Sequence, residues 1–304
     1  MSVCCVTERT SQPLYCADLR LELHCHSTCS DGSLDPEQLA QALSEFGVEL
    51  ACLTDHDTMA GCDRLATELA NTSTGAPAKV LRGLELSSKH AGRTIHLLIW
   101  GVADGPGREQ LERRLAIQLQ RRRERIVAIC GRFAALGIEL DAEAILAGAS
   151  GTPGRPDVAR ALVNAGVCKT MRAAFEKYLR DNGPADVPIA SLELGEALAL
   201  GRAAGARMSL AHPHTLRHYA VVRELFVEFR DQGLEGIEAF YGQASPARAE
   251  PWLRLARELD LVPTAGSDFH GDALADVTRP GIEIPLAYAV RLREWLADAP
   301  EIRL

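Results

Sequence analysis

Short apolar runs alternate with segments of helical period over residues 18–102 of this 304-residue chain. In the first run, Leu19, Leu21 and Leu23 alternate with polar residues, which is the period of a strand. The same reasoning predicts strands at 18–26, 49–58, 79–87 and 93–102, and helices at 35–48 and 60–71. Asp35 is the expected N-cap of the first helix, with Pro36 at its first position. Repeated β-α-β units predict parallel strands with right-handed crossovers.

The middle of the chain has a different pattern. Residues 105–198 are predicted to be helical, with a long basic amphipathic helix at 107–137, shorter helices at 151–166 and 170–183, and no strand. The strand and helix rhythm returns at 206–214, 233–242, 246–260 and 261–271. We therefore expect an α/β body formed by residues 18–104 and 199–304, a helical insertion at 105–198, and a loose N-terminal extension at 1–17.

Two histidines lie at the end of the first predicted strand, on either side of Cys25. Residues i and i+2 of a strand point to the same face, so His24 and His26 are expected to project together while Cys25 points away. Asp31 follows five residues after His26, in a Gly/Ser turn. The arrangement suits a metal site, although two unrelated polar residues at a strand end would give the same pattern.

Polar residues also follow the other predicted strands, where parallel α/β folds gather their functional groups. They are Asp55, His56 and Asp57, then Glu85, His96 and His212, and finally Asp268 and His270. Imidazole nitrogens and carboxylate oxygens together suit zinc, manganese or iron, and a carboxylate can bridge two ions. Taken singly, His96 could be a core histidine, Glu85 could cap a loop, and Asp31 could cap a turn.

Composition and charge narrow the class of protein. The net charge of −8 argues against broad nucleic-acid binding, including binding to double-stranded DNA, but allows a nucleotide in a locally basic pocket. Nine cysteines without a CxxC pair predict reduced thiols. No secretory signal and no bilayer-spanning apolar run are evident, so we expect a cytoplasmic protein without a membrane partner. The sequence makes no prediction of oligomeric state.

Several ordered motifs resemble those of the PHP (polymerase and histidinol phosphatase) family. They are HCHSTCSDGS, TDHDT, GLELS with His96 beyond it, AHP and GSDFHG, and they span residues 18–272. The resemblance implies a distorted (β/α)7 barrel with two to three divalent ions, manganese before iron or zinc. It also implies three ligand sets: His24, His26, Glu85 and Asp268; Glu85, His96 and His212; and Asp31, His56 and His270.

Clustered divalent ions suit phosphoester hydrolysis by metal-bound hydroxide, and the chain has neither a GxSxG nor a Walker motif. Asp31, His56 and His270 are the expected catalytic residues. The general acid could be a metal ligand, Asp55, Asp57 or water.

Within the family, TPGRPDVARALV and AFEKYL resemble the 3′,5′-nucleoside bisphosphate phosphatases. The resemblance implies removal of the 3′-phosphate from a small nucleotide such as adenosine 3′,5′-bisphosphate, with the insertion as a substrate cap. Arg155 and Arg217 would then bind the phosphate that is not cleaved. The chain departs from the family pattern at Asp157, where histidine is usual, and in AHPHTLRHY, where His214 and His218 could partly substitute.

Other functions remain in competition with this hypothesis. One is a 5′-to-3′ exonuclease on short RNA, and another is a histidinol-phosphatase-like phosphomonoesterase. A noncatalytic module attached to a polymerase is disfavoured because the chain has no room for a polymerase. A metal-dependent amidohydrolase is disfavoured because no lysine lies at a comparable strand end.

Overall fold

A computed structural model describes residues 19–72, 78–149, 151–242, 246–273 and 277–303. The predicted N-terminal extension at 1–17 therefore lies outside the described residues. Within these ranges, no helix is long and apolar enough to cross a membrane.

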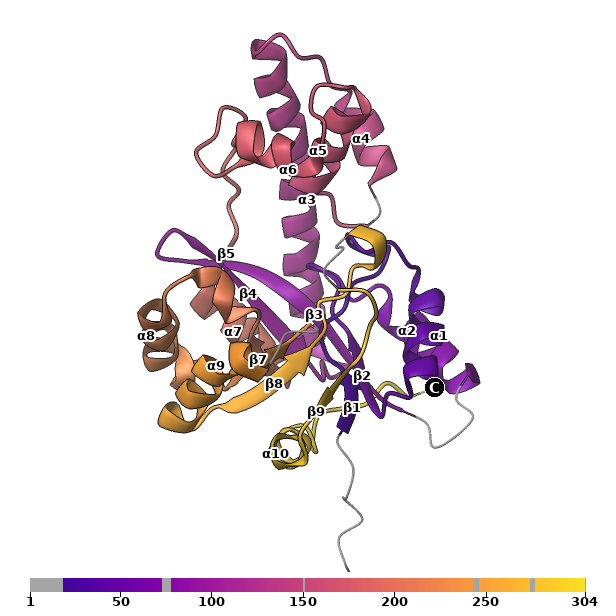
Figure 1. The fold of residues 1–304 in the computed structure, drawn as a ribbon, viewed down its shortest axis with the longest axis vertical. Coiled ribbons are helices and arrows are strands. Elements are labelled where there is room, and N and C mark those ends of the chain that lie inside the picture. The colour runs from indigo at the N-terminus through magenta and orange to yellow at the C-terminus, as the bar shows by residue number, and fades with distance from the viewer. Residues whose placement is uncertain (1–18, 73–77, 150, 243–245, 274–276, 304) are drawn as a thin grey trace, which may run out of the picture.

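A nine-stranded sheet forms the body of the protein (Figure 1). Its strands are β1 (Leu19–Glu22), β2 (Leu50–Leu53), β3 (Lys79–His90), β4 (Arg93–Trp100), β5 (Leu192–Glu193), β6 (Arg207–Leu210), β7 (Gly236–Tyr241), β8 (Val262–Gly266) and β9 (Ile282–Ile284). The order is β8-β7-β6-β4-β3-β2-β1-β9, and β5 pairs with β3.

The seven strands from β8 to β1 curve into a nearly closed barrel. Backbone hydrogen bonds close it just beyond β1 and β8, from His26 N to Phe269 O (2.9 Å) and from Asp268 N to His24 O (2.6 Å). Along β1 itself, Leu19–Leu21 pair with β9 in place of β8, so the ladder of the barrel is left open there. The expected distorted seven-stranded barrel is confirmed.

The expectation of uniformly parallel strands is wrong at three pairings. β3 and β4 form an antiparallel hairpin, β4 pairs antiparallel with β6, and β1 pairs antiparallel with β9. Only Ala91 and Gly92 connect β3 to β4, and both have positive φ (47° and 76°), as a tight hairpin turn requires. A parallel connection needs a crossover of a dozen or more residues. As a result, the start of β4 lies beside the C-terminal end of β3, and β4 runs back along β3 in the opposite direction.

Helices cover the outside of the barrel. They are α1 (Pro36–Phe46), α2 (Cys62–Thr72), α7 (Leu194–Ala203), α8 (Tyr219–Phe229), α9 (Pro246–Leu259) and α10 (Leu286–Trp295), with 3-10 turns η2 (Pro213–Leu216), η3 (Arg230–Gln232) and η4 (Gly271–Ala273). Asp35 caps α1 as predicted: it accepts a hydrogen bond from Gln38 N, and the Gln38 side chain accepts one from Asp35 N. This is a reciprocal capping box.

A helical group stands on one side of the barrel (Figure 1). It consists of α3 (Pro106–Ala135), α4 (Ala142–Gly148), α5 (Arg155–Asn164), α6 (Met171–Ala174) and the π-helical turn η1 (Phe175–Leu179). We call this group the helical insertion. It has a hydrophobic core of its own around Ile129, Phe133, Val158 and Leu162. The long helix α3 runs from the barrel into this core.

Two elements near the end of the predicted insertion belong to the sheet and its covering layer. The short strand β5 pairs with β3, in a region where no strand was expected. Residue 198 lies inside α7, whose buried side chains pack with strands β3, β4 and β6 in the largest core of the barrel. A two-residue strand leaves no periodic signal in the sequence, because periodicity needs several residues to show itself.

Trp100 fills the barrel interior below the polar strand ends. It is fully buried, and its indole N–H donates a hydrogen bond to Leu23 O, across the barrel on β1's extension (2.9 Å). Leu98 and Trp100 share one face of β4 with His96, because alternate residues of a strand point the same way. The apolar base of the barrel therefore supports the strand segments that carry His24 and His96.

We expect substitution of Trp100 to destabilise the barrel. Trp100→Phe should lower the free energy of unfolding by about 1–3 kcal/mol, since it leaves the buried Leu23 carbonyl without its donor. Trp100→Ala should cost about 3–5 kcal/mol because it also opens a cavity. Urea denaturation followed by circular dichroism measures both values. Val227→Ala, at a side chain that is 64% exposed, is the control and should change stability by less than about 0.5 kcal/mol. Wild-type stability of Trp100→Ala would contradict this role.

Candidate metal centre

All nine residues predicted as metal ligands come together at one end of the barrel. They follow or lie within six different strands: His24, His26 and Asp31 after β1, His56 after β2, Glu85 in β3, His96 in β4, His212 after β6, and Asp268 and His270 after β8. His96 reaches this end from the first half of β4, because β4 runs antiparallel to β3. Cys25 points away into the core beneath α1 and α2, as the alternation predicted.

Glu85 lies at the centre of the group and is fully buried. Its two oxygens contact different sets of imidazoles. Oε2 lies 3.1–3.2 Å from nitrogens of His24, His26 and His56. Oε1 lies 2.8 Å from His96 Nδ1 and 2.9 Å from His212 Nε2. Glu85 is thus placed between two groups of histidines, as a bridging carboxylate would be.

The first group of donor atoms surrounds Asp268. Asp268 Oδ1 lies 3.2 Å from His24 Nε2 and 3.2 Å from His26 Nε2. Together with Glu85, these three residues offer one ligand atom each within 4.8 Å of one another. The set is the one that the family resemblance implied for one ion.

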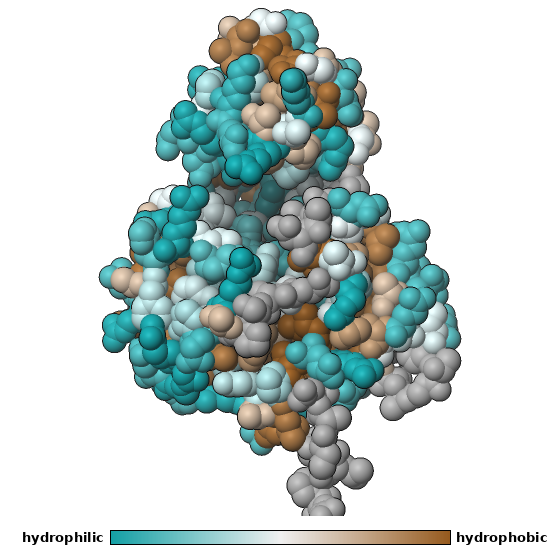
Figure 2. All heavy atoms as spheres, viewed as in Figure 1, coloured by the Kyte–Doolittle hydropathy of each residue, from teal (hydrophilic) through white to brown (hydrophobic). Residues whose placement is uncertain are grey.

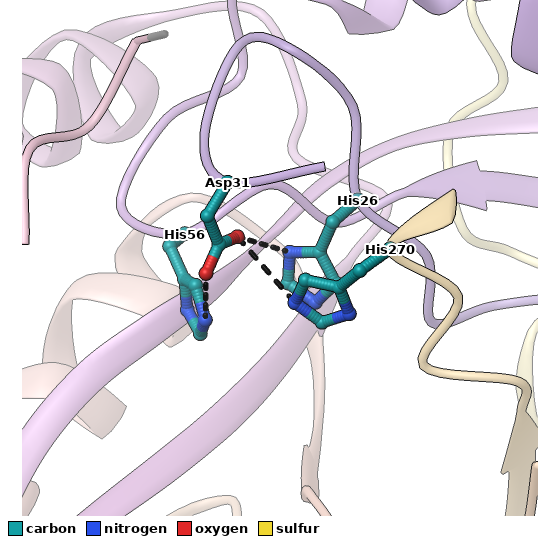
Figure 3. A group of neighbouring side chains, drawn as sticks. All are labelled: His26, Asp31, His56 and His270. Carbon is teal, nitrogen blue, oxygen red and sulfur yellow. Dashed lines mark ion pairs between the residues drawn. The ribbon is translucent and has the colours of Figure 1, made fainter. Parts of the chain in front are cut away.

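The second group surrounds Asp31 (Figure 3). Asp31 Oδ1 lies 3.4 Å from His270 Nε2 and 3.7 Å from His26 Nδ1, and Oδ2 lies 3.8 Å from His56 Nε2. The family resemblance implied Asp31, His56 and His270 as one ligand set, and the structure adds His26 to this group.

The third group consists of His56, Glu85 and His96. His212, which was expected here, lies close to the same atoms: its Nε2 is 3.4 Å from His96 Nδ1. His56 therefore adjoins both the second and the third group.

Three buried atoms in the cluster have no hydrogen-bond partner among the described residues. They are His26 Nε2, Asp31 Oδ1 and His56 Nδ1. A buried polar atom without a partner is costly, so such atoms call for an ion or a water. The donors are imidazoles and carboxylates, which suit borderline divalent cations. The residues present therefore fit a group of divalent metal ions.

The cluster also shifts the pKa values of its members. Burial alone would raise the pKa of Glu85, but the surrounding imidazoles, with His56 and His96 foremost, hold it well below its usual range. Burial lowers the pKa of His56 to about 4, against the attraction of Glu85 and Asp31. Glu85 is thus an anion near neutral pH, which is the form of a carboxylate that binds cations.

Two buried glutamates orient the ligands from behind, and sequence reasoning missed both. Glu238 of β7 accepts hydrogen bonds from His24 Nδ1 (2.8 Å) and from His212 N (2.6 Å). Glu22 of β1 accepts hydrogen bonds from the backbone of His24 and from Ser267 N and Oγ. An acidic residue inside an apolar strand, as in GIEAFY, was the available signal.

Tyr241, at the end of β7, is a further residue that the sequence analysis missed. Its hydroxyl donates a hydrogen bond to Asp268 Oδ2 (2.7 Å), while Asp268 Oδ1 faces His24 and His26. Burial and the neighbouring Asp268 carboxylate raise the pKa of Tyr241, so the hydroxyl keeps its proton. Asp268 itself has a left-handed backbone conformation (φ 55°).

Asp55 and Asp57, two of the candidates for the general acid, have structural partners. Asp55 accepts hydrogen bonds from Ser27 N, Ser27 Oγ and Ser30 Oγ at 2.6–2.7 Å and so shapes the turn between His26 and Asp31. Asp57 forms an ion pair with Arg122 of α3. Both carboxylates are directed at these partners.

The two arginines predicted to bind substrate lie apart from the nine residues. Arg155 begins α5 in the helical insertion, where it donates hydrogen bonds to Leu179 O (3.0 Å) and Asp181 Oδ1 (2.7 Å). Arg217 is exposed after η2, with φ 64°. Within the described ranges, no hydrogen bond or ion pair joins either arginine to the nine residues.

The two departures from the family pattern have distinct structural settings. Asp157 accepts a hydrogen bond from Gly154 N (2.8 Å) and pairs with Arg160 (3.0 Å), so it caps the start of α5. His214 packs its ring against Tyr241 (4.6 Å between centroids) at the rim of the cluster, whereas His218 is the exposed residue before α8.

This chain is similar to known proteins in sequence and in fold. Residues 22–131 match the PHP domain. A 5′-3′ exoribonuclease of Haemophilus influenzae is 34% identical over 255 residues, covering 83% of this chain and 90% of that protein. A 3′,5′-nucleoside bisphosphate phosphatase of Chromobacterium violaceum is 30% identical, covering 82% of this chain and 87% of that protein. The solved structure of an amidohydrolase from C. violaceum, with bound sulfate and no metal, superimposes with a TM-score of 0.76 at 26% identity, covering 89% of this chain and 96% of that one.

These likenesses agree with the geometry of the barrel end. The similarity to the Haemophilus protein extends over more than four fifths of this chain. The motifs that resemble PHP sequences supply side chains that the fold gathers into one buried cluster with the donors of a metal centre. The chain belongs to the PHP family of metal-dependent phosphoric ester hydrolases.

Proposed function

We propose that the protein removes the 3′-phosphate of nucleoside 3′,5′-bisphosphates, converting adenosine 3′,5′-bisphosphate to AMP and phosphate. The observation that carries the proposal is the buried cluster around Glu85, in which all nine predicted ligand positions hold competent donors. The similarity to a protein named 3′,5′-nucleoside bisphosphate phosphatase supports this choice of substrate. A cytoplasmic location remains part of the proposal.

The nine residues would hold two or three divalent ions, manganese first and iron or zinc next. Such ions, when bound, neutralise charge on phosphoryl oxygens and lower the pKa of water. Glu85 would join the ligand groups, and Glu238 and Tyr241 would fix the orientation of His24 and Asp268.

Asp31, His56 and His270 are the proposed catalytic residues. The side chains of Asp31, His96 and His56 are 28%, 24% and 19% exposed, whereas Glu85, His24 and His26 are almost fully enclosed. Substrate and water would therefore reach the cluster from the side of Asp31, His96 and His56.

The helical insertion would act as the substrate cap. The face seen in Figure 2 is hollowed between the helical insertion and the barrel, and hydrophilic side chains border the hollow. Arg155 would bind the phosphate that is not cleaved, and Arg217 is the second candidate for that contact. Asp157 stands where the family usually has histidine, but its charge is offset by Arg160 and by Gly154 N–H.

A second candidate function is the removal of nucleotides from the 5′ end of short RNA. The observation that favours it is the 34% identity to a protein named 5′-3′ exoribonuclease. The same metal chemistry serves a phosphodiester and a phosphomonoester, so the cluster itself allows both.

The direct test measures how fast the manganese-loaded enzyme hydrolyses two different substrates. Adenosine 3′,5′-bisphosphate should release one phosphate and leave AMP, with a higher kcat/KM than a 5′-phosphorylated RNA trimer. Chromatography of the products with a phosphate assay measures both reactions. Faster hydrolysis of the trimer would move the assignment to the exonuclease, and failure to cleave any phosphoester would contradict the proposed function.

Glu85→Gln should disable the centre while conserving side-chain size. The amide carries no charge to hold cations among five imidazoles, so we expect loss of bound metal and a fall in kcat/KM of more than about 100-fold. Elemental analysis of the purified protein and phosphate release measure the two effects. Glu250→Gln, in an exposed pair with Arg257 on α9, is the matched control and should keep metal and activity. Full metal content in Glu85→Gln would show that Glu85 is not a ligand.

Arg155→Ala should raise the KM for adenosine 3′,5′-bisphosphate by about 10-fold or more, since a charge-assisted hydrogen bond to the 5′-phosphate is lost. With adenosine 3′-monophosphate, which has no 5′-phosphate, wild type and variant should have similar KM values. Arg172→Ala, in an exposed pair with Glu176 in the helical insertion, is the control. An equal loss on both substrates would mean that Arg155 acts on the fold of the helical insertion and not on the 5′-phosphate.

A further inference from the structure

An ion pair joins the helical insertion to the turn that carries His56. Asp57, the residue after His56, accepts hydrogen bonds on Oδ2 from Arg122 Nε (2.9 Å) and Nη2 (2.5 Å). Its Oδ1 accepts one from Ser87 N (2.7 Å), two residues beyond Glu85 on β3. The Asp57 side chain is 1% exposed and that of Arg122 is 19% exposed. This is a two-pronged contact, largely shielded from water, between α3 and the metal-ligand turn.

Further contacts fix the same turn from several sides. Gln118, one helical turn before Arg122, donates hydrogen bonds to Ser87 O (3.2 Å) and Asp57 Oδ1 (3.4 Å). Thr152, in the segment before α5, donates one to His56 O (2.8 Å). Asp57 N donates to Glu85 O (2.9 Å). The His56–Asp57 turn is therefore held by β3, which carries Glu85, by α3 of the helical insertion, and by the segment before α5.

The backbone of the turn needs such support. Asp57 has φ 54°, in the left-handed region that a residue with a side chain adopts at a cost of about 1–3 kcal/mol. Its carboxylate gains hydrogen bonds only in the conformation that directs it toward Arg122 and Ser87. Asp57 is thus a strained residue beside the predicted ligand His56, and helix α3 of the helical insertion stabilises it. This indicates that the position of His56 depends on the geometry of the turn.

We propose that Arg122 is a positioning residue that fixes the His56–Asp57 turn and the helical insertion relative to each other. Arg122 lies on α3 just before Ile126 and Ile129, which enter the core of the helical insertion. Through Asp57, it holds the His56 imidazole against Glu85, and through α3 it sets where the insertion stands above the cluster. The consequence for substrate binding rests on the proposed function; the consequence for His56 does not.

The planar guanidinium of Arg122 lets one side chain hydrogen-bond both Asp57 and Ser87. Arg122 donates two hydrogen bonds to one Asp57 oxygen and a third to Ser87 Oγ (2.9 Å). A lysine ammonium keeps the charge but lacks the planar fork. Arg122→Lys should therefore bind metal at the cluster more weakly than wild type does, but more tightly than Arg122→Gln.

The test measures metal binding in the absence of substrate. Cobalt(II) is titrated into the metal-free full-length protein, and its visible absorption reports the coordination at the cluster. We expect Arg122→Gln to weaken cobalt binding at one step of the titration by about 10- to 100-fold, the range known for residues that orient metal ligands. Asp57→Asn should have a similar effect, and the double variant should be no worse than either single one, because the pair acts as a unit.

Arg123→Gln is the matched control, since Arg123 is exposed on the same helix. It should bind cobalt as wild type does. In the manganese enzyme, Arg122→Gln should also raise the KM for adenosine 3′,5′-bisphosphate, because the helical insertion is no longer held in place.

Wild-type cobalt affinity and spectrum in Arg122→Gln would overturn the proposal, whatever happens to thermal stability. A lowered melting temperature with unchanged cobalt binding would show that the ion pair only supports the fold. If the wild-type enzyme does not hydrolyse the bisphosphate, the proposed function fails, but the cobalt titration still decides the role of Arg122.

Discussion

The structure depends on the burial of one carboxylate, that of Glu85, among five imidazoles. A buried charge is costly unless opposite charge and hydrogen bonds surround it. The histidines supply part of that compensation, and divalent cations would supply the rest. The buried negative charge at this end of the barrel therefore requires nearby positive charge. The strands that end there carry the histidines that surround it.

The distortion of the barrel serves this arrangement. A tight turn at Ala91 and Gly92 sends β4 back antiparallel beside β3, so His96 enters the cluster next to Glu85 from the start of its strand. The near closure between β1 and β8 brings His24 and His26 against Asp268. The apolar base around Trp100 packs under both, so the ligands rest on a rigid support.

Strand alternation and polar residues at strand ends predicted an α/β body with polar groups gathered at one edge, and the resemblance to PHP sequences implied the barrel and the nine ligand positions. The sequence did not predict the partners that orient these residues. Glu238, Tyr241 and Arg122 act on His24, Asp268 and Asp57 through contacts between distant segments, which leave no fixed spacing in the chain. The antiparallel course of β4 was missed because the parallel rule was applied across a two-residue turn. Asp55 and Asp57 show the same limit: their residue type suggested acid chemistry, but the sequence did not connect them to their partners Ser27 and Arg122.

The most direct test of the central claim is anomalous diffraction from crystals grown with manganese, recorded at the manganese absorption edge. The account predicts two or three anomalous peaks in the cluster, with Glu85 Oε1 and Oε2 each bound to an ion. Peaks absent from the cluster at saturating manganese, or peaks that leave Glu85 without a bound ion, would contradict it.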